Sequence, residues 1–267
     1  MTEHHLSDAE MQHWQSEGFL IRRQVFTGEH LARLQQAVER AAAKAYDLVP
    51  DGKTYHLDGK RFVDINQMTV QFEHQPGSDT IKVIEPVHQL DSVLSELIDD
   101  PRITEPMQDL VGSESLALWT DKLNLKRPHE GSGFGWHQDS PYWMHDCQHL
   151  DQLPNVYIAL DDATRENGCL RLIRGSHLQG CLPGTEDGSQ LGGFYTSLNC
   201  FDPADEVLLE APAGSLAFFN AHTIHGSEPN QSDQPRRALV LTYQPGGFPQ
   251  LKSGQQREIN LPRTETV

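Results

Sequence analysis

From about residue 115 onward, the chain is a series of short β-forming runs separated by turn-rich stretches, and this texture limits the possible folds more than any other feature. The turns contain clusters of Gly, Pro, Asn and Asp, for example at 166–168 and 228–235. Many short strands joined by turns indicate an antiparallel sandwich or barrel. The expected strands cover residues 116–125, 156–160, 169–173, 207–209, 216–219 and 238–243.

The earlier part of the chain carries helical signals instead. A capping box that begins at Ser7 starts a short helix, and Thr27 precedes a stripe of apolar residues at helical spacing. A third helical region covers residues 91–111 and is interrupted by Pro101 and Pro106. We therefore expect an α+β protein, mainly β, whose N-terminal helices pack on the outside of the sheet.

Length and texture together predict one domain. The 267 residues exceed the roughly 100–200 residues of an ordinary domain, but single β-rich domains of about 250 residues are common. No internal repeat or low-complexity linker divides the chain. We expect a single domain over residues 1–267, with a helical part at about 1–112 and a β core at about 113–245.

The acidic composition restricts the possible partners. The 21 Lys and Arg residues stand against 38 Asp and Glu residues, which gives a formal net charge of −17. Such a surface repels phosphate backbones and anionic lipid headgroups, so we expect neither nucleic acid nor a membrane as a partner. A highly anionic substrate would need a local basic pocket.

Other features predict a soluble, cytoplasmic monomer or homodimer. The four cysteines form no CxxC pair, which fits reduced thiols better than a disulfide framework. The N-terminal sequence has no basic segment followed by an apolar one, as a signal peptide would have. No stretch approaches the roughly 18 consecutive apolar residues of a membrane span.

The segment Gly135-Trp136-His137-Gln138-Asp139 carries the first half of a candidate metal site. In an extended segment, residues i and i+2 point to the same face, so His137 and Asp139 can converge while Gln138 faces away. A distant histidine would complete a triad of two histidines and one carboxylate, with positions left open for a co-substrate and O₂. Alone, the pair is weak evidence, because a strand-edge histidine beside a solvated carboxylate has the same pattern.

The second half lies downstream, where an apolar run delivers His225, followed by Arg236 at the start of another apolar run. A buried arginine beside a metal needs an anion, and its planar fork suits a carboxylate such as the distal one of 2-oxoglutarate. Strand alternation sends Arg236 and the neighbouring Arg237 to opposite faces, so only one of the two can face the metal. Strand alternation also directs His222 to the face opposite His225. We therefore expect His222 to be a structural or pocket-lining residue and not a metal ligand.

An ordered set of motifs resembles the phytanoyl-CoA dioxygenase family. The set comprises HQD at 137–139, ENGCL at 166–170, GSH at 175–177 and HGS at 225–227, followed by Arg236. The HxD motif alone is common, whereas the ordered set is specific. The resemblance extends over residues 82–243, most of the chain.

The resemblance implies a double-stranded β-helix (jelly-roll, cupin-like) core with flanking helices. It also implies Fe(II) as cofactor, 2-oxoglutarate and O₂ as co-substrates, and hydroxylation of an unactivated C–H bond. Since relatives that halogenate replace the carboxylate ligand with a small residue, Asp139 favours oxygen insertion or desaturation. Carried over by position, the implied iron ligands are His137, Asp139 and His225, and the implied co-substrate contacts are Arg236, Ser227, Tyr157, Lys82 and Leu123.

The substrate is the least determined part of the prediction. We expect a small or medium-sized metabolite, as in natural-product tailoring, because no basic cluster for a coenzyme A pyrophosphate is visible. A metalloenzyme of another class and a non-catalytic binding protein remain alternatives, although neither has an evident use for Arg236 beside a metal. The residues expected at the substrate are Trp136, Tyr142, Trp143, Asn66 and Gln67.

Overall fold

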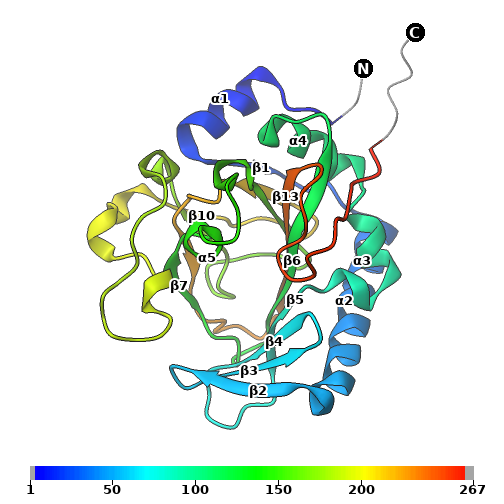
Figure 1. The fold of residues 1–267 in the computed structure, drawn as a ribbon, viewed down its shortest axis with the longest axis vertical. Coiled ribbons are helices and arrows are strands. Elements are labelled where there is room, and N and C mark those ends of the chain that lie inside the picture. Colours follow the sequence, from blue (N-terminus) through cyan, green and yellow to red (C-terminus); the bar gives the residue numbers. More distant parts are fainter. Residues whose placement is uncertain (1–3, 262–267) are drawn as a thin grey trace.

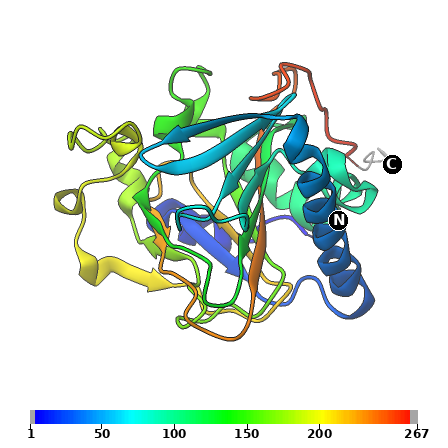
Figure 2. The ribbon, with the colours of Figure 1, turned by 90° about the horizontal axis from the view of Figure 1, so that it is seen from below.

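The computed structural model describes residues 4–261, which form two facing antiparallel sheets, with α2, α3 and α4 on the outer side of the larger sheet (Figures 1 and 2). The larger sheet has nine strands in the order β1-β11-β8-β13-β6-β5-β4-β3-β2, and the smaller has four in the order β10-β9-β12-β7. The helices are α1 (Asp8–Glu17), α2 (Gly28–Leu48), α3 (Ser92–Leu97), α4 (Pro101–Val111) and α5 (Ser140–Trp143). The strands are β1 (Phe19–Arg22), β2 (Lys53–Leu57), β3 (Lys60–Ile65), β4 (Met68–Phe72), β5 (Ile81–Glu85), β6 (Leu116–Lys126), β7 (Phe134–His137), β8 (Asn155–Ala159), β9 (Arg171–Ile173), β10 (Glu206–Leu208), β11 (Leu216–Phe219), β12 (His225–Ser227) and β13 (Arg236–Pro245).

This architecture confirms the predicted jelly-roll core with flanking N-terminal helices. Each of the six runs expected from the β-forming texture contains or overlaps a strand, from β6 to β13. The capping box at Ser7 is formed, with Gly18 ending α1 in the left-handed conformation. Helix α2 begins after Thr27, although the Thr27 side chain makes no capping hydrogen bond. Among residues 4–261, no helix has both the length and the apolar character needed to cross a membrane.

Two expectations for the first part of the chain need correction. Residues 53–85 are not helical but form β2 to β5, which extend the large sheet beside β6. Their alternation was hard to recognise because β2 and much of β3 carry polar, partly exposed residues. The helical region at 91–111 is broken at Pro101, which starts α4, but Pro106 lies inside α4 without ending it.

The large sheet separates two apolar clusters. On its outer face, α2, α3 and α4 pack against alternate residues of the long strands, including Leu123 and Leu239. On its inner face, a smaller cluster that includes Tyr157 and Val240 lies between the two sheets. The pairing of β6 with β13 sets Arg236 opposite Lys126, and the pleat directs both toward the space between the sheets.

A buried carboxylate ties β6 to the segment that follows β5. Asp121 accepts hydrogen bonds from the backbone N–H groups of Val87 and His88, at 2.9 and 2.8 Å, and contacts the His88 ring nitrogen Nδ1 at 2.6 Å. Its side chain is fully buried. These contacts fix the middle of β6, next to Lys122, which lines the cavity.

We expect Asp121→Ala to lower the free energy of unfolding by about 2–4 kcal/mol, because it leaves buried donors without an acceptor. Urea unfolding monitored by circular dichroism measures the change. Asp47→Ala, at an exposed position of α2, is the matched control and should change the stability by less than about 0.5 kcal/mol. Equal effects of the two substitutions would contradict this role of Asp121.

Candidate active site

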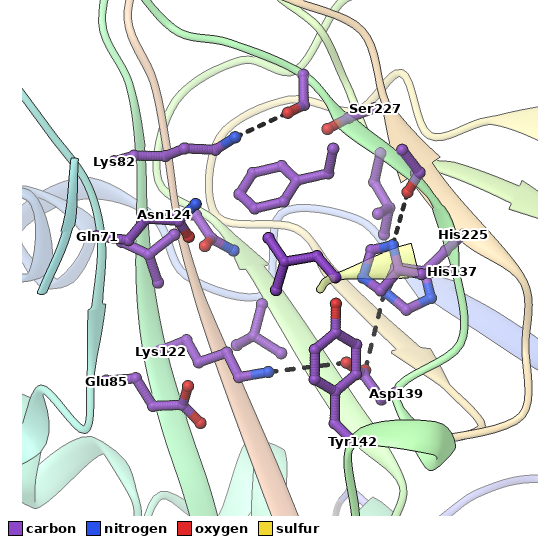
Figure 3. Close-up of a pocket in the computed structure, with 18 of the residues that line it drawn as sticks. Gln71, Lys82, Glu85, Lys122, Asn124, His137, Asp139, Tyr142, His225 and Ser227 are labelled. Atoms are coloured by element: carbon purple, nitrogen blue, oxygen red, sulfur yellow. Dashed lines mark hydrogen bonds and ion pairs between the residues drawn. The ribbon is translucent and has the colours of Figure 1, made fainter. Parts of the chain in front are cut away.

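A cavity of about 870 Å³ lies between the two sheets (Figure 3). Its walls come from β5, β6, β8 and β13 of the large sheet, from β7 and β12 of the small sheet, and from α5. At the mouth, the Lys60 ammonium donates a hydrogen bond of 2.7 Å to the Tyr195 hydroxyl. The volume lies within the range of ordinary small-molecule sites.

The predicted triad assembles in this cavity. Strand β12 pairs with β7 so that His225 lies opposite His137, and their ring centroids are 4.1 Å apart. Asp139 follows β7 at the start of α5, where its backbone N–H donates to the carbonyl of Ala221. One ligand atom from each of the three residues lies within 4.8 Å of the other two. These three residues form a 2-His-1-carboxylate facial triad, the ligand arrangement of non-haem Fe(II) oxygenases.

Backbone carbonyls orient both imidazole rings. The Nδ1 atom of His137 lies 2.7 Å from the carbonyl oxygen of Gly135, and that of His225 lies 2.9 Å from the carbonyl of Thr223. A ring whose Nδ1–H donates to a carbonyl presents the lone pair of Nε2 to a metal. Burial, together with the neighbouring His225, lowers the pKa of His137 to about 3, so this ring is neutral, as a metal ligand must be.

Two neighbours hold the carboxylate of Asp139. The side-chain amide of Asn155 donates a 2.9 Å hydrogen bond to Oδ2, and the Lys122 ammonium lies 3.7 Å from Oδ1. Burial by itself raises the pKa of Asp139, but Lys122 and the two histidines outweigh it, so the net shift is downward. The carboxylate is therefore ionised and oriented without a metal. The ligand atoms of His137, Asp139 and His225 fit a divalent ion that keeps open coordination positions.

The other end of the cavity is a cluster of buried cations. Arg236 is 3% exposed, and its nearest polar neighbour is the Tyr157 hydroxyl, 3.4 Å from a terminal guanidinium nitrogen. The Nε atom of Arg236 has no hydrogen-bond partner among residues 4–261. Lys126 donates to the hydroxyl of Ser227 at 2.9 Å, and Lys82 donates to the Ser132 hydroxyl at 2.9 Å.

The pKa values of both lysines record how strongly this cluster disfavours positive charge. Burial lowers the pKa of Lys82 to about 7, with Glu73 opposing the shift. Burial and the charge of Arg236 lower the pKa of Lys126 to about 5. A dianion bound beside the lysines raises their pKa values, because it stabilises their charged forms. The cluster therefore fits an acidic ligand such as the distal carboxylate of 2-oxoglutarate.

Comparison with known proteins identifies the family. The sequence profile of the phytanoyl-CoA dioxygenase (PhyH) family matches residues 14–238. The chain belongs to the phytanoyl-CoA dioxygenase family. It is 30% identical over 186 residues to the L-proline trans-4-hydroxylase of Streptomyces griseoviridis, covering 63% of this chain and 69% of that protein. It is 28% identical over 254 residues to the ectoine dioxygenase of Bordetella bronchiseptica, covering 89% of this chain and 75% of that protein.

Solved structures show the same fold. The crystal structure of EctD from S. alaskensis with 2-oxoglutarate and 5-hydroxyectoine gives a TM-score of 0.67 at 20% identity, covering 92% of this chain and 78% of that chain. The crystal structure of the carbocyclase SnoK from nogalamycin biosynthesis gives a TM-score of 0.66 at 18% identity, covering 95% of this chain and 96% of that chain. As a phytanoyl-CoA dioxygenase family member with this triad, the protein is an Fe(II)- and 2-oxoglutarate-dependent oxygenase.

Most residues that the sequence predicted for this family site line the cavity. Arg236 faces the cavity, whereas Arg237 pairs with Asp161 and Glu39 on the other side of the sheet. His222 contacts Asp151 rather than the triad, so it is not part of the ligand set. The cavity walls also include Ser227, Tyr157, Lys82, Tyr142 and Trp143.

Four of the residues predicted at the co-substrate or the substrate do not line the cavity. Leu123 belongs to the core beneath the helices, since it alternates with the cavity-facing residues of β6. Trp136 alternates with His137 and packs against Phe201 with a centroid distance of 5.2 Å. Asn66 and Gln67 are exposed in the turn between β3 and β4, where Asn66 adopts a φ of 55°.

Several cavity residues escaped the sequence prediction. Lys122 and Asn124 of β6 and Glu85 at the end of β5 line the cavity. Lys126 at the end of β6 and Asn155 at the start of β8 lie behind the wall, where they donate hydrogen bonds to Ser227 and Asp139. Strand alternation around Leu123 was the available signal for the residues of β6. Nothing local marks Asn155 or Glu85, because both reach the site only through pairing with distant strands.

We expect Asn155→Leu to weaken metal binding by about 10- to 100-fold, because Asp139 loses the donor that orients it. Anaerobic titration with Fe(II), followed by competition with a chelator, measures the affinity. Asn199→Leu, at an exposed position of the short 3-10 helix Leu198–Cys200, is the matched control. Unchanged affinity in Asn155→Leu would show that Asp139 needs no such support.

Proposed function

We propose that this oxygenase hydroxylates an unactivated C–H bond of a small or medium-sized metabolite, with Fe(II) bound by His137, Asp139 and His225. The substrate C–H bond, O₂ and 2-oxoglutarate are converted to the C–OH product, succinate and CO₂. Tyr142 and Trp143 form the aromatic wall beside the substrate. The residues assigned to the co-substrate are Arg236, Ser227, Tyr157 and Lys82.

The buried guanidinium of Arg236, which forms no ion pair within residues 4–261, is the observation that carries this assignment. A buried cation with no counter-charge costs folding free energy, so its presence indicates a ligand of opposite charge. The planar fork of arginine suits a bidentate carboxylate. A metalloenzyme of another class, or a binding protein with this fold, has no use for such a clamp in the same cavity as the triad.

The protein contributes ligand orientation and exclusion of water. The carbonyls of Gly135 and Thr223 keep the Nε2 atoms of the two histidines aimed at one point. Trp143 is 1% exposed and closes one side of the cavity. Iron bound there, together with the 2-oxo acid, supplies the oxidising power that removes the substrate hydrogen. The chain aims one C–H bond and limits access of other reductants.

The first prediction from this assignment concerns co-substrate binding without oxygen. With Fe(II) and 2-oxoglutarate, the wild type should develop the weak visible band that arises when a 2-oxo acid chelates ferrous iron. His225→Ala should lose the band, because one iron ligand is missing. Arg236→Ala should need at least about 30-fold more 2-oxoglutarate, because it loses a charged clamp.

Arg237→Ala is the matched control, because Arg237 carries the same charge on the opposite face of the same strand. It should leave the 2-oxoglutarate requirement unchanged. Failure of the wild type to develop the band despite bound iron would refute the co-substrate assignment. Equal effects of the two arginine substitutions would refute the role of Arg236.

The second prediction concerns the pH dependence of co-substrate binding. The pKa of Lys82 is about 7 in the folded protein, so this lysine loses its charge as the pH rises above 7. The bound dianion stabilises the charged form of Lys82. Above pH 7, Lys82 therefore takes up a proton when 2-oxoglutarate binds. The affinity for 2-oxoglutarate should fall between pH 7 and 9, by up to about tenfold per pH unit.

Calorimetry in buffers of different ionisation enthalpy measures this proton uptake directly. Lys82→Met should bind 2-oxoglutarate more weakly at pH 7 and should remove most of the slope between pH 7 and 9. Lys44→Met, at an exposed position of α2, should behave as the wild type. A slope that persists in Lys82→Met would assign the titration to another group.

A further inference from the structure

Beyond the metal and the cation cluster, the cavity wall carries two adjacent side chains of opposite charge. Strands β5 and β6 pair with Val83 opposite Asn124 and Ile84 opposite Leu123. One step further in the same register, Glu85 faces Lys122, and both side chains line the cavity (Figure 3). Opposed residues of paired strands have Cβ atoms about 5 Å apart.

The ammonium group of Lys122 is poorly satisfied by the protein. Its nearest carboxylate oxygen, Asp139 Oδ1, is 3.7 Å away, which is too long for a strong hydrogen bond. It lies 5.5 Å from the centroid of the Trp143 ring. Lys122 thus presents positive charge beside the triad.

The carboxylate of Glu85 also has capacity left for a ligand. Its Oε1 accepts a 2.8 Å hydrogen bond from the Thr120 hydroxyl, and no ion pair with Lys122 forms within residues 4–261. Figure 3 shows Glu85 and Lys122 side by side on the large sheet, with Tyr142 and Asp139 across the cavity. Two charges that simply neutralised each other would lie in direct contact.

The charge of the whole cavity supports a ligand with an acidic group. The chain has a net charge of −17, yet the cavity lining carries five cationic side chains against three carboxylates. The cations are Lys60, Lys82, Lys122, Lys252 and Arg236, and the carboxylates are Glu85, Asp139 and Asp146. A basic pocket in an acidic protein attracts anions locally. Glu85 at the inner wall then requires a positive charge on the same ligand. A purely anionic substrate would leave Glu85 facing a like charge.

We propose that the substrate is a zwitterion of the amino-acid type, with a free ammonium group and a carboxylate on one carbon. Lys122 binds the carboxylate and Glu85 binds the ammonium group. The spacing of two opposed strand residues matches the short separation of these groups. The head group is thereby held on the large sheet, and the carbons beyond it extend toward the triad. This proposal rests on the proposed function, because it assigns the substrate of the same site.

Binding measurements without oxygen test the proposal separately from turnover. The protein, loaded with Fe(II) and 2-oxoglutarate, is titrated in a calorimeter with a panel of L-amino acids. Each amino acid that binds is compared with the amine that lacks its carboxylate and with its N-acetyl derivative. Free amino acids should bind at least about 30-fold more tightly than either derivative, because each derivative loses one charge pair. With O₂ present, the same amino acids should increase succinate formation.

Variants assign each half of the head group. Lys122→Met should bind the amino acid no better than the amine, and Lys122→Arg should retain the preference. Glu85→Gln should remove the preference over the N-acetyl derivative. Lys44→Met and Glu114→Gln remove the same charges at exposed positions and should behave as the wild type.

Three results would overturn the proposal. The first is that no amino acid of the panel binds, and the second is that the variants leave both preferences intact. The third is that Lys122→Met weakens iron or 2-oxoglutarate binding instead, which would assign Lys122 to Asp139 or to the co-substrate. Loss of the 2-oxo acid band in the wild type is a separate outcome, because it refutes the proposed function itself.

Discussion

The antiparallel pairing of β6 with β13 determines where the charged groups of the cavity lie. Its register sets Arg236 opposite Lys126, and the pleat directs both toward the space between the sheets. The alternate residues, such as Leu123 and Leu239, form the core beneath the helices. Like charges directly opposite each other destabilise a sheet. The fold therefore keeps an unfavourable pair at the place where a bound anion relieves it, beside a triad held by the second sheet.

The features that were predictable from the sequence rest on local patterns. Short β-forming runs between turns indicated the jelly roll, because strand length and turn chemistry are local properties. The spacing of His137 and Asp139 predicted their convergence, and the three triad residues do meet within 4.8 Å. Alternation separated Arg236 from Arg237 for the same reason. The ordered motifs then indicated the family, which the profile match confirms.

The features that were missed depend on contacts between distant segments or on weak patterns. Strands β2 to β4 lie at one edge of the large sheet, where polar and half-exposed residues hide the alternation. Leu123 was placed at the co-substrate, but strand alternation directs it to the core, because its neighbours Lys122 and Asn124 face the cavity. Asn66 was placed at the substrate, yet its positive φ marks a turn residue, a conformation that Asn tolerates well. Asn155 meets Asp139 only because β8 of the large sheet faces the segment that follows β7 of the small sheet.

The unsatisfied guanidinium of Arg236 also affects the lifetime of the folded chain. A ligand that binds only the native state adds to its stability by mass action, by about 2.7 kcal/mol at a hundredfold excess over its dissociation constant. Arg236 is buried with its Nε atom unpaired among residues 4–261, and Lys126 is buried beside it, so the ligand-free protein lacks this contribution. Resistance to unfolding and proteolysis should therefore follow the supply of the dicarboxylate. Under the proposed assignment of Arg236, the co-substrate is a part of the core that can be removed, and its concentration affects the stability of the folded chain.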